Sequence, residues 1–115
     1  MADFKTKEDV DVLEVDACLV ATGRIPATQD IGLDSVSVEL DRRKFIPVND
    51  SMAVLSQGEP VPHLWAIGDA TGKMMLAHAA SAQGITAVEN ICGRTKEIDY
   101  SSIPAAAFTH PEISY

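Results

Sequence analysis

The chain has 115 residues, of which 46% are hydrophobic and 23% charged, and its formal net charge at pH 7 is -8. This composition is typical of a globular α/β protein and excludes an intrinsically disordered chain. No apolar run reaches the about 20 residues of a membrane-spanning helix, so we expect no membrane partner. We expect no nucleic-acid partner either, because general nucleic-acid binding needs a basic patch and the longest basic cluster, Arg42–Lys44, reads as a solvated turn.

Short apolar runs predict strands in the first half of the chain. Residues 15–22, VDACLVAT, are predicted to form a buried strand, and residues 36–40, VSVEL, a half-exposed one because apolar and polar residues alternate there. Residues 41–44 are predicted to form a turn. The following run at 45–48, FIPV, is predicted to be another strand, with Pro47 indicating an edge position.

The second half of the chain is predicted to contain a buried strand followed by the main helix. The strand is expected at 64–68, LWAIG, after an extended approach fixed by two prolines. The helix is expected at about 75–92, where Gly93 stops it. Residues 102–115 read as the start of a new element. The predicted inner face of the helix is made of Ala77, Ala80, Gly84, Val88 and Ile91.

The two cysteines, Cys18 and Cys92, do not form a redox or metal-binding motif, because 74 positions separate them. Both lie in or at the end of apolar runs, so we expect buried thiols. Reduced cysteines fit an intracellular compartment. The chain also contains no G-x-G-x-x-G and no P-loop motif.

Gly68 and Asp69 end the predicted strand at 64–68. Because ligands of open α/β sheets bind at the carboxyl ends of strands, Gly68 would leave room for a bulky group and Asp69 would offer an acceptor to sugar or polyol hydroxyls. The alternative is that Asp69 caps its own turn. The two readings are evenly balanced on these residues alone.

The start of the predicted helix has no good capping residue, because Lys73, Met74 and Met75 precede it. Uncapped amides at the positive end of a helix attract negative charge, although water can also satisfy them. A second small-residue site precedes this one, at ATGR. There Gly23 would let the backbone approach a cofactor, and Arg24 would face either a phosphate or solvent.

Taken together, four stretches resemble the flavoprotein disulfide reductases, and within that family the dihydrolipoamide dehydrogenase branch of plastid and cyanobacterial type. They are VDACLVATGRIP, GLDSVSVELDRRKFIPVND, VPHLWAIGDATGKMMLAHAASAQGITAVENICG and SIPAAAFTHPEISY, and they follow the family's order from residue 10 onward. The resemblance implies an α/β fragment of a flavoprotein with two dinucleotide-binding domains. Residues 1–22 resemble the end of the NAD-binding domain, 23–98 the second segment of the FAD-binding domain and 99–115 the start of the dimer-interface domain.

The resemblance also implies the cofactors FAD and NAD, with most of the NAD site outside this chain. Asp69 would accept a hydrogen bond from the ribityl chain of the flavin, and backbone N–H groups around Leu76, Ala77 and His78 would point at its pyrimidine edge. The expected cofactor-binding residues are Gly23, Arg24, Gly68, Asp69, Met75, Leu76, Ala77 and His78.

The chain departs from the family where catalysis takes place. It has neither the redox-active CxxxxC nor the acid–base His–Glu pair near the C-terminus, so no catalytic residue is expected in it. His110, His78 and His63 are read as structural or surface residues. The resemblance thus implies an inactive internal fragment of an enzyme that oxidises dihydrolipoamide through a disulfide and FAD to NAD.

The implied partners are a lipoyl-bearing carrier domain of 2-oxo acid dehydrogenase complexes and a second copy in a homodimer. The implied location is the plastid stroma, or otherwise the cytoplasm or the mitochondrial matrix. Two alternatives stay open: a sibling reductase of glutathione or mercuric type, and a non-catalytic dimerisation or binding module.

Overall fold

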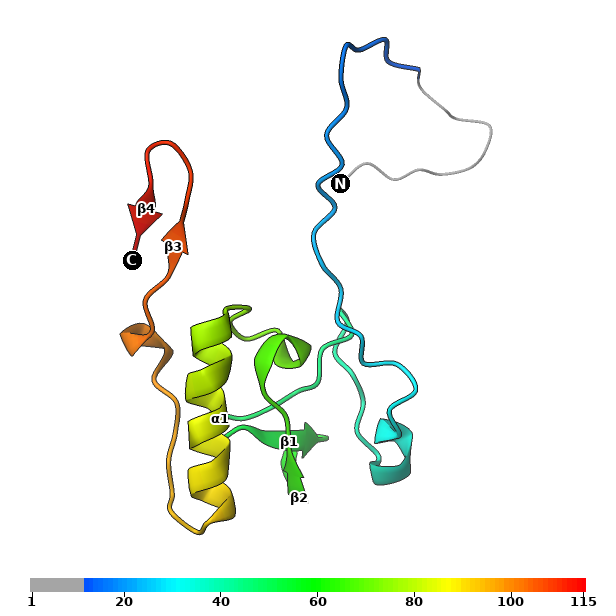
Figure 1. The fold of residues 1–115 in the computed structure, drawn as a ribbon. Helices are drawn as coiled ribbons and strands as arrows, with labels where there is room; N and C mark the ends of the chain where they lie inside the picture. The colour runs from blue at the N-terminus through cyan, green and yellow to red at the C-terminus, as the bar shows by residue number, and fades with distance from the viewer. Residues whose placement is uncertain (1–11) are drawn as a thin grey trace.

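A computed structural model describes residues 12–115, in which one α-helix lies beside a β-hairpin and a second, smaller hairpin projects away (Figure 1). This confirms an α/β arrangement of short strands and one main helix. The strands are β1 Ala53–Ser56, β2 Glu59–Trp65, β3 Ala106–Ala107 and β4 Ile113–Ser114, the helix is α1 Ala77–Ile91, and the 3-10 turns are η1 Leu33–Val36, η2 Gly68–Thr71 and η3 Tyr100–Ser102.

The hairpin of β1 and β2 is built around a two-residue turn at Gln57 and Gly58. Both residues have positive φ, 52° and 90°, the pattern of a turn whose twist matches that of antiparallel strands. The strand predicted at 64–68 is therefore misplaced, because β2 begins at Glu59 and ends at Trp65. The strand pairs are Ala53 with Trp65, Leu55 with Pro60 and Ser56 with Glu59.

The buried core gathers around Met52, which is fully buried although its φ is +65°. Hydrogen bonds impose this conformation: Met52 N–H donates to Asn49 O at 3.1 Å, and Met52 O accepts from Ala66 N–H at 3.1 Å. The buried core residues are Val38, Ile46, Val48, Met52, Val54 and Ala87. The core therefore joins the hairpin to the helix through few side chains.

Two of the strands predicted near this core are not formed as strands. In the segment 36–40, Val36 ends η1 and Ser37 has a φ of +56°, so the alternating pattern is interrupted, although Val38 is buried. In the segment 45–48, only Val48 makes a β-bridge, to Val54. The predicted turn at 41–44 is confirmed, since the Asp41 carboxylate accepts from Arg43 N–H and Phe45 N–H, each at 2.8 Å.

The segment predicted as a buried strand at 15–22 is extended, unpaired and exposed. Leu19 is 88% exposed and Val20 79%, and no strand of the described residues lies beside them. A strand is stable only with a partner that takes up its backbone hydrogen bonds. The same segment carries Cys18, which is exposed and free, as is Cys92 just after α1, so the expectation of buried thiols was wrong.

Helix α1 forms within two residues of the predicted bounds, and Gly93 follows it with a φ of +78°. Its buried face differs from the predicted one. Ala79, Gln83, Thr86 and Ala87 are buried, whereas Val88 and Ile91 are more than half exposed. The apolar periodicity was misleading because two polar side chains point inward.

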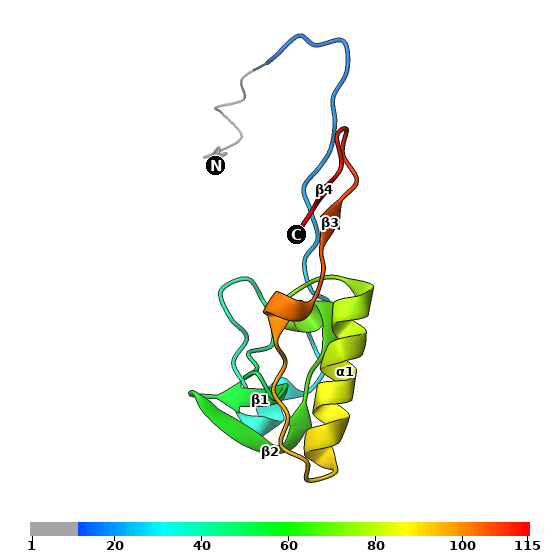
Figure 2. The same ribbon diagram turned by 90° about the vertical axis from the view of Figure 1, so that its left-hand side faces the viewer.

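The chain beyond α1 runs back along the helix (Figure 2). The Asn90 amide holds it there, because Nδ2 donates to Thr86 O at 2.9 Å and to Lys96 O at 2.7 Å. Ile98 N–H also donates to Asp50 O at 2.9 Å. The chain then enters η3 and the β3–β4 hairpin, in which Ala106 pairs with Ser114, so the new element predicted at 102–115 is a hairpin.

The chain is open for its size. Its accessible surface is 9601 Å², whereas a compact monomer of this mass would expose about 6,100 Å². The radius of gyration is 18.8 Å, compared with about 13 Å for a compact domain of this length. No helix among residues 12–115 has both the length and the apolar character needed to cross a bilayer.

Candidate functional site

A cavity of about 300 Å³ lies between the segment 24–27, Phe45 and the η2 turn. We call it the η2 cavity. It brings together three residues that the sequence singled out, Arg24, Asp69 and Met75, although Arg24 lies 45 or more positions before the other two. Its lining residues are Arg24, Ile25, Pro26, Ala27, Phe45, Asp69, Ala70 and Met75.

Asp69 is the second residue of η2 and not the tip of a strand, because β2 has already ended at Trp65. The turn is closed without its carboxylate: Gly72 N–H donates to the backbone carbonyl of Asp69 at 3.1 Å, and the Thr71 hydroxyl donates to Gly68 O at 2.9 Å. The Asp69 side chain is exposed and accepts no hydrogen bond from the described residues. The hydrogen bonds that close the turn therefore leave the carboxylate available to a ligand.

The glycines that flank Asp69 allow close packing. Gly68 has a φ of +73°, and a Cβ placed on it would lie 3.7 Å from Ala80 Cβ. Gly72 has a φ of +66°, and its Cβ would fall 2.6 Å from the ring of Phe45. The neighbouring Ile46 N–H donates to Ala70 O at 2.9 Å, so the wall of the η2 cavity is tied to the core by a hydrogen bond as well.

Helix α1 begins without a side-chain cap, as predicted, and Leu76 occupies the N-cap position in an extended conformation. Leu76 N–H donates to Met74 O at 2.9 Å, so this amide already has a partner. Ala77 and His78 lie in the first helical turn, where a helix leaves its N–H groups without an internal acceptor. These amides and the positive end of the helix dipole follow directly after Met75 of the cavity wall.

The other predicted residues lie away from the cavity lining. The His78 imidazole is turned toward the C-terminal segment, where Nε2 lies 2.7 Å from Pro104 O. Gly23 precedes Arg24 with a φ of +80° and nothing within 4 Å of its Cβ position. His63 and His110 are both exposed, which fits the surface reading of His63.

Gln83 is a residue of this site that sequence reasoning missed. Its side chain is fully buried, Oε1 accepts from Gly68 N–H at 2.6 Å, and Nε2 donates to the Tyr100 hydroxyl at 3.1 Å. Burial raises the pKa of Tyr100, the hydrogen bond from Gln83 opposes that shift, and the nearby Asp50 adds to it. In the sequence, Gln83 is a single amide among small residues. A search for apolar periodicity does not detect a buried polar side chain of this kind.

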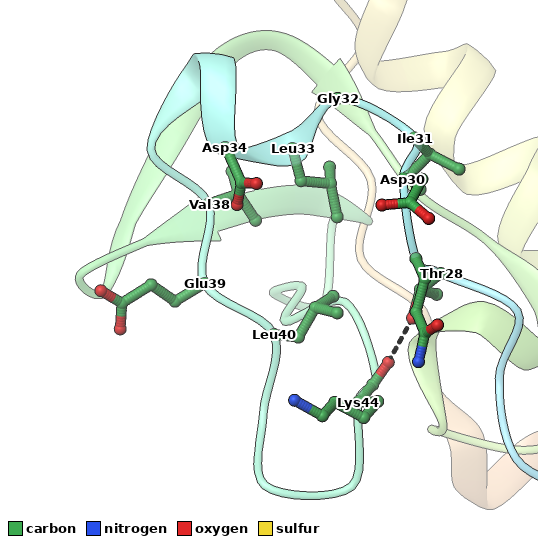
Figure 3. Close-up of a pocket in the computed structure, with 11 residues that line it drawn as sticks. Thr28, Asp30, Ile31, Gly32, Leu33, Asp34, Val38, Glu39, Leu40 and Lys44 are labelled. Carbon is green, nitrogen blue, oxygen red and sulfur yellow. Dashed lines mark hydrogen bonds between the residues drawn. The ribbon is translucent and has the colours of Figure 1, made fainter.

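A larger cavity of about 460 Å³ lies on the loop around η1 (Figure 3). Thr28 closes one side, because its hydroxyl donates to Lys44 O at 2.6 Å. Asp30, Asp34 and Glu39 are among its lining residues, but the described residues include no cluster with metal-ligand geometry. None of the predicted site residues lines this cavity, so the η2 cavity is the better candidate site.

Comparison with known proteins gives consistent matches. The family profile described as pyridine nucleotide-disulphide oxidoreductase matches residues 2–84. A dihydrolipoyl dehydrogenase of Synechocystis is 74% identical over 100% of this chain, which covers 24% of that protein. The chloroplastic dihydrolipoyl dehydrogenase 2 of Arabidopsis thaliana is 57% identical over 99% of this chain, which covers 20% of it.

Solved structures show the same fold. LpdA from Mycobacterium tuberculosis superposes with a TM-score of 0.66 at 32% identity, over 78% of this chain and 19% of its own. The flavoprotein disulfide reductase RclA from Escherichia coli gives a TM-score of 0.67 at 24% identity, over 89% of this chain and 23% of its own, and supports the fold alone. The chain thus spans about a quarter or less of the length of these relatives.

Proposed function

Because this chain belongs to the pyridine nucleotide-disulphide oxidoreductase family, we propose that it is a segment of a dihydrolipoyl dehydrogenase and supplies part of the FAD site. In this proposal, residues 1–22 end the NAD-binding domain, 23–98 form the second segment of the FAD-binding domain and 99–115 begin the dimer-interface domain. The observation that carries the proposal is the exposed Asp69 carboxylate on the η2 cavity, which accepts no hydrogen bond from the described residues.

The chemistry of the η2 cavity fits FAD. The Asp69 carboxylate is an acceptor for a hydroxyl of the ribityl chain, and the Arg24 guanidinium on the same cavity is a donor for a phosphate. The amides of Ala77 and His78 at the uncapped helix start favour a group that carries negative charge. The proposed cofactor-binding residues are Gly23, Arg24, Gly68, Asp69, Met75, Leu76, Ala77 and His78, with Leu76 acting through its position at the N-cap, since its N–H is already used.

When bound, FAD would supply the electron-transfer chemistry between a dithiol substrate and NAD, most of whose site lies outside this chain. The residues of this chain bind and orient. Asp69 and Arg24 would hold the flavin's polar chain at two points. The hydrogen bond from Ile46 N–H to Ala70 O keeps the wall of the η2 cavity beside Asp69 in place. No catalytic residue is proposed here, because the sequence contains neither a CxxxxC nor an acid–base His–Glu pair.

The proposed substrate carrier of the complete enzyme is a lipoyl-bearing domain of 2-oxo acid dehydrogenase complexes. The proposed oligomer is a homodimer, to which the exposed β3–β4 hairpin would contribute. The proposed location is the plastid stroma, supported by the 57% identity to a chloroplastic relative, with the cytoplasm or the mitochondrial matrix as the corresponding places in other lineages.

The test compares Asp69→Asn with Asp34→Asn in the full-length protein that contains this chain. The two positions match, because each is the second residue of a four-residue 3-10 turn whose closing N–H donates to its backbone carbonyl. Asn keeps an acceptor oxygen but loses the charge, so a charge-assisted hydrogen bond becomes a neutral one at a cost of about 1.4 kcal/mol, which should weaken FAD binding about tenfold in Asp69→Asn only. Equal FAD retention in both variants after dialysis would refute the proposed site.

A further inference from the structure

The η2 turn that carries Asp69 lacks a cap from its own chain neighbours, and the Gln83 side chain of α1 fills that role. Ile67 is the N-cap residue of η2 and makes no side-chain hydrogen bond to the turn. The first amide of the turn, Gly68 N–H, donates to Gln83 Oε1 at 2.6 Å. A side chain 15 positions further along the sequence thus caps the turn.

The other end of the Gln83 amide is tied down as well. Nε2 donates to the Tyr100 hydroxyl at 3.1 Å, and Tyr100 opens η3, which the Asp99 side chain caps through Ser101 N–H at 2.9 Å. Gln83 itself is 0% exposed. Its amide therefore has no access to water, and its orientation is set by one donor and one acceptor on two other elements.

Burial makes this bond sensitive to substitution. If Oε1 were removed, the half-buried Gly68 N–H would lose its acceptor, and an unpaired amide that is partly removed from water is costly. The turn that would relax carries Asp69 and Ala70, which line the η2 cavity.

We propose that Gln83 is a positioning residue for flavin binding: it holds Gly68 and so fixes the place of Asp69 on the η2 cavity. This inference rests on the proposed function. It adds a residue that does not touch the cavity, and it links the cavity wall to the segment 99–115 through Tyr100.

The experiment uses the full-length protein loaded with FAD and three variants. Gln83→Met keeps the length of the side chain but offers Gly68 N–H no oxygen acceptor. Gln83→Glu keeps the acceptor, and the Tyr100 hydroxyl can turn to donate to it. Asn90→Met is the control, because it removes a half-buried amide of the same helix that holds the segment near Lys96 and does not contact η2.

We expect Gln83→Met to release FAD about tenfold faster and to shift the visible absorption bands of the bound flavin, because an unpaired amide costs of the order of a factor of ten. Gln83→Glu should show the wild-type rate of FAD release and the wild-type flavin spectrum. Asn90→Met should lower the urea midpoint of unfolding and leave the spectrum of the bound flavin unchanged. In a protein that already carries Asp69→Asn, Gln83→Met should speed FAD release by a smaller factor than it does in the wild type. The two effects are not additive because both act through the contact between residue 69 and FAD.

The inference is overturned if Gln83→Met and Asn90→Met change FAD release equally, or if Gln83→Glu is as defective as Gln83→Met. If Gln83→Met does not fold, Gln83→Asn replaces it, with a shorter side chain that cannot reach Gly68, and wild-type release from that variant overturns the inference too. A folded wild-type protein that binds no FAD would instead refute the proposed function.

Discussion

Gly72→Ala should weaken both the fold and the η2 cavity, because the added methyl group has no room. Its Cβ would lie 2.6 Å from two carbon atoms of the Phe45 ring and 2.8 Å from a third, closer than non-bonded carbons approach. Overpacking of this kind costs roughly 1–3 kcal/mol. The φ of +66° adds about 1–2 kcal/mol, because alanine pays a steric penalty in the left-handed region.

Gly93→Ala is the matched control for the backbone contribution. Gly93 has a φ of +78°, but nothing lies within 4 Å of its Cβ position. Gly93→Ala therefore carries only the steric penalty of the left-handed backbone and no overpacking. The expected excess loss of stability in Gly72→Ala is therefore roughly 1–3 kcal/mol. Because Phe45 also lines the η2 cavity, FAD should be released at a lower urea concentration from Gly72→Ala than from Gly93→Ala.

The assay is urea titration of the full-length protein, followed by flavin absorbance for release and by circular dichroism for unfolding. Phe45→Ala, alone and combined with Gly72→Ala, completes the cycle. In the Phe45→Ala background, Gly72→Ala should lower the free energy of unfolding by no more than Gly93→Ala does in the wild type. The steric reasoning is refuted if Gly72→Ala and Gly93→Ala are equally destabilised, or if removal of the ring brings no relief.

Three further predictions concern other parts of the chain. Burial raises the pKa of Tyr100 above its ordinary value, so the stabilisation linked to the neutral phenol is present below about pH 10 and is lost as the pH rises through the folded pKa. Tyr100→Phe should therefore flatten the dependence of the unfolding midpoint on pH between about pH 9 and pH 11. His78→Ala should leave FAD affinity nearly unchanged, because its backbone amide persists, but should speed amide hydrogen exchange in 104–115, where the bond to Pro104 is lost; unchanged exchange would contradict this role. The isolated 115-residue chain, with its 9601 Å² of exposed surface, should show no dihydrolipoamide-dependent NAD reduction and should associate on gel filtration, and a monomer with a cooperative melt would disprove the second part.

The sequence predicted best what depends on local residues. Helix α1 was placed within two residues because its bounds depend on an uncapped start and on Gly93. The turn at 41–44 was found because Asp41 can close it alone. Arg24, Asp69 and Met75 were singled out from their own surroundings and the family resemblance, and the structure places all three on one cavity.

What depends on contacts between distant segments was missed. The run at 15–22 has the composition of a strand, but no strand of the described residues pairs with it. The hairpin of β1 and β2 was overlooked because its turn, Gln57 and Gly58, carries a non-glycine residue at positive φ. Gln83 was missed because a buried amide is recognised only by its partners, and those partners come from η2 and η3.

The Asn90 amide that fastens the chain beyond α1 also makes this region sensitive to chemical ageing. Asparagine is among the thermolabile residues of proteins, and its hydrolysis to aspartate would exchange the Nδ2 donor for a carboxylate oxygen. That oxygen would face the carbonyl oxygens of Thr86 and Lys96, both of which now accept hydrogen bonds from Nδ2. A stored sample that gains one mass unit at Asn90 would therefore lose the hydrogen bond by which Nδ2 holds the chain at Lys96 to α1.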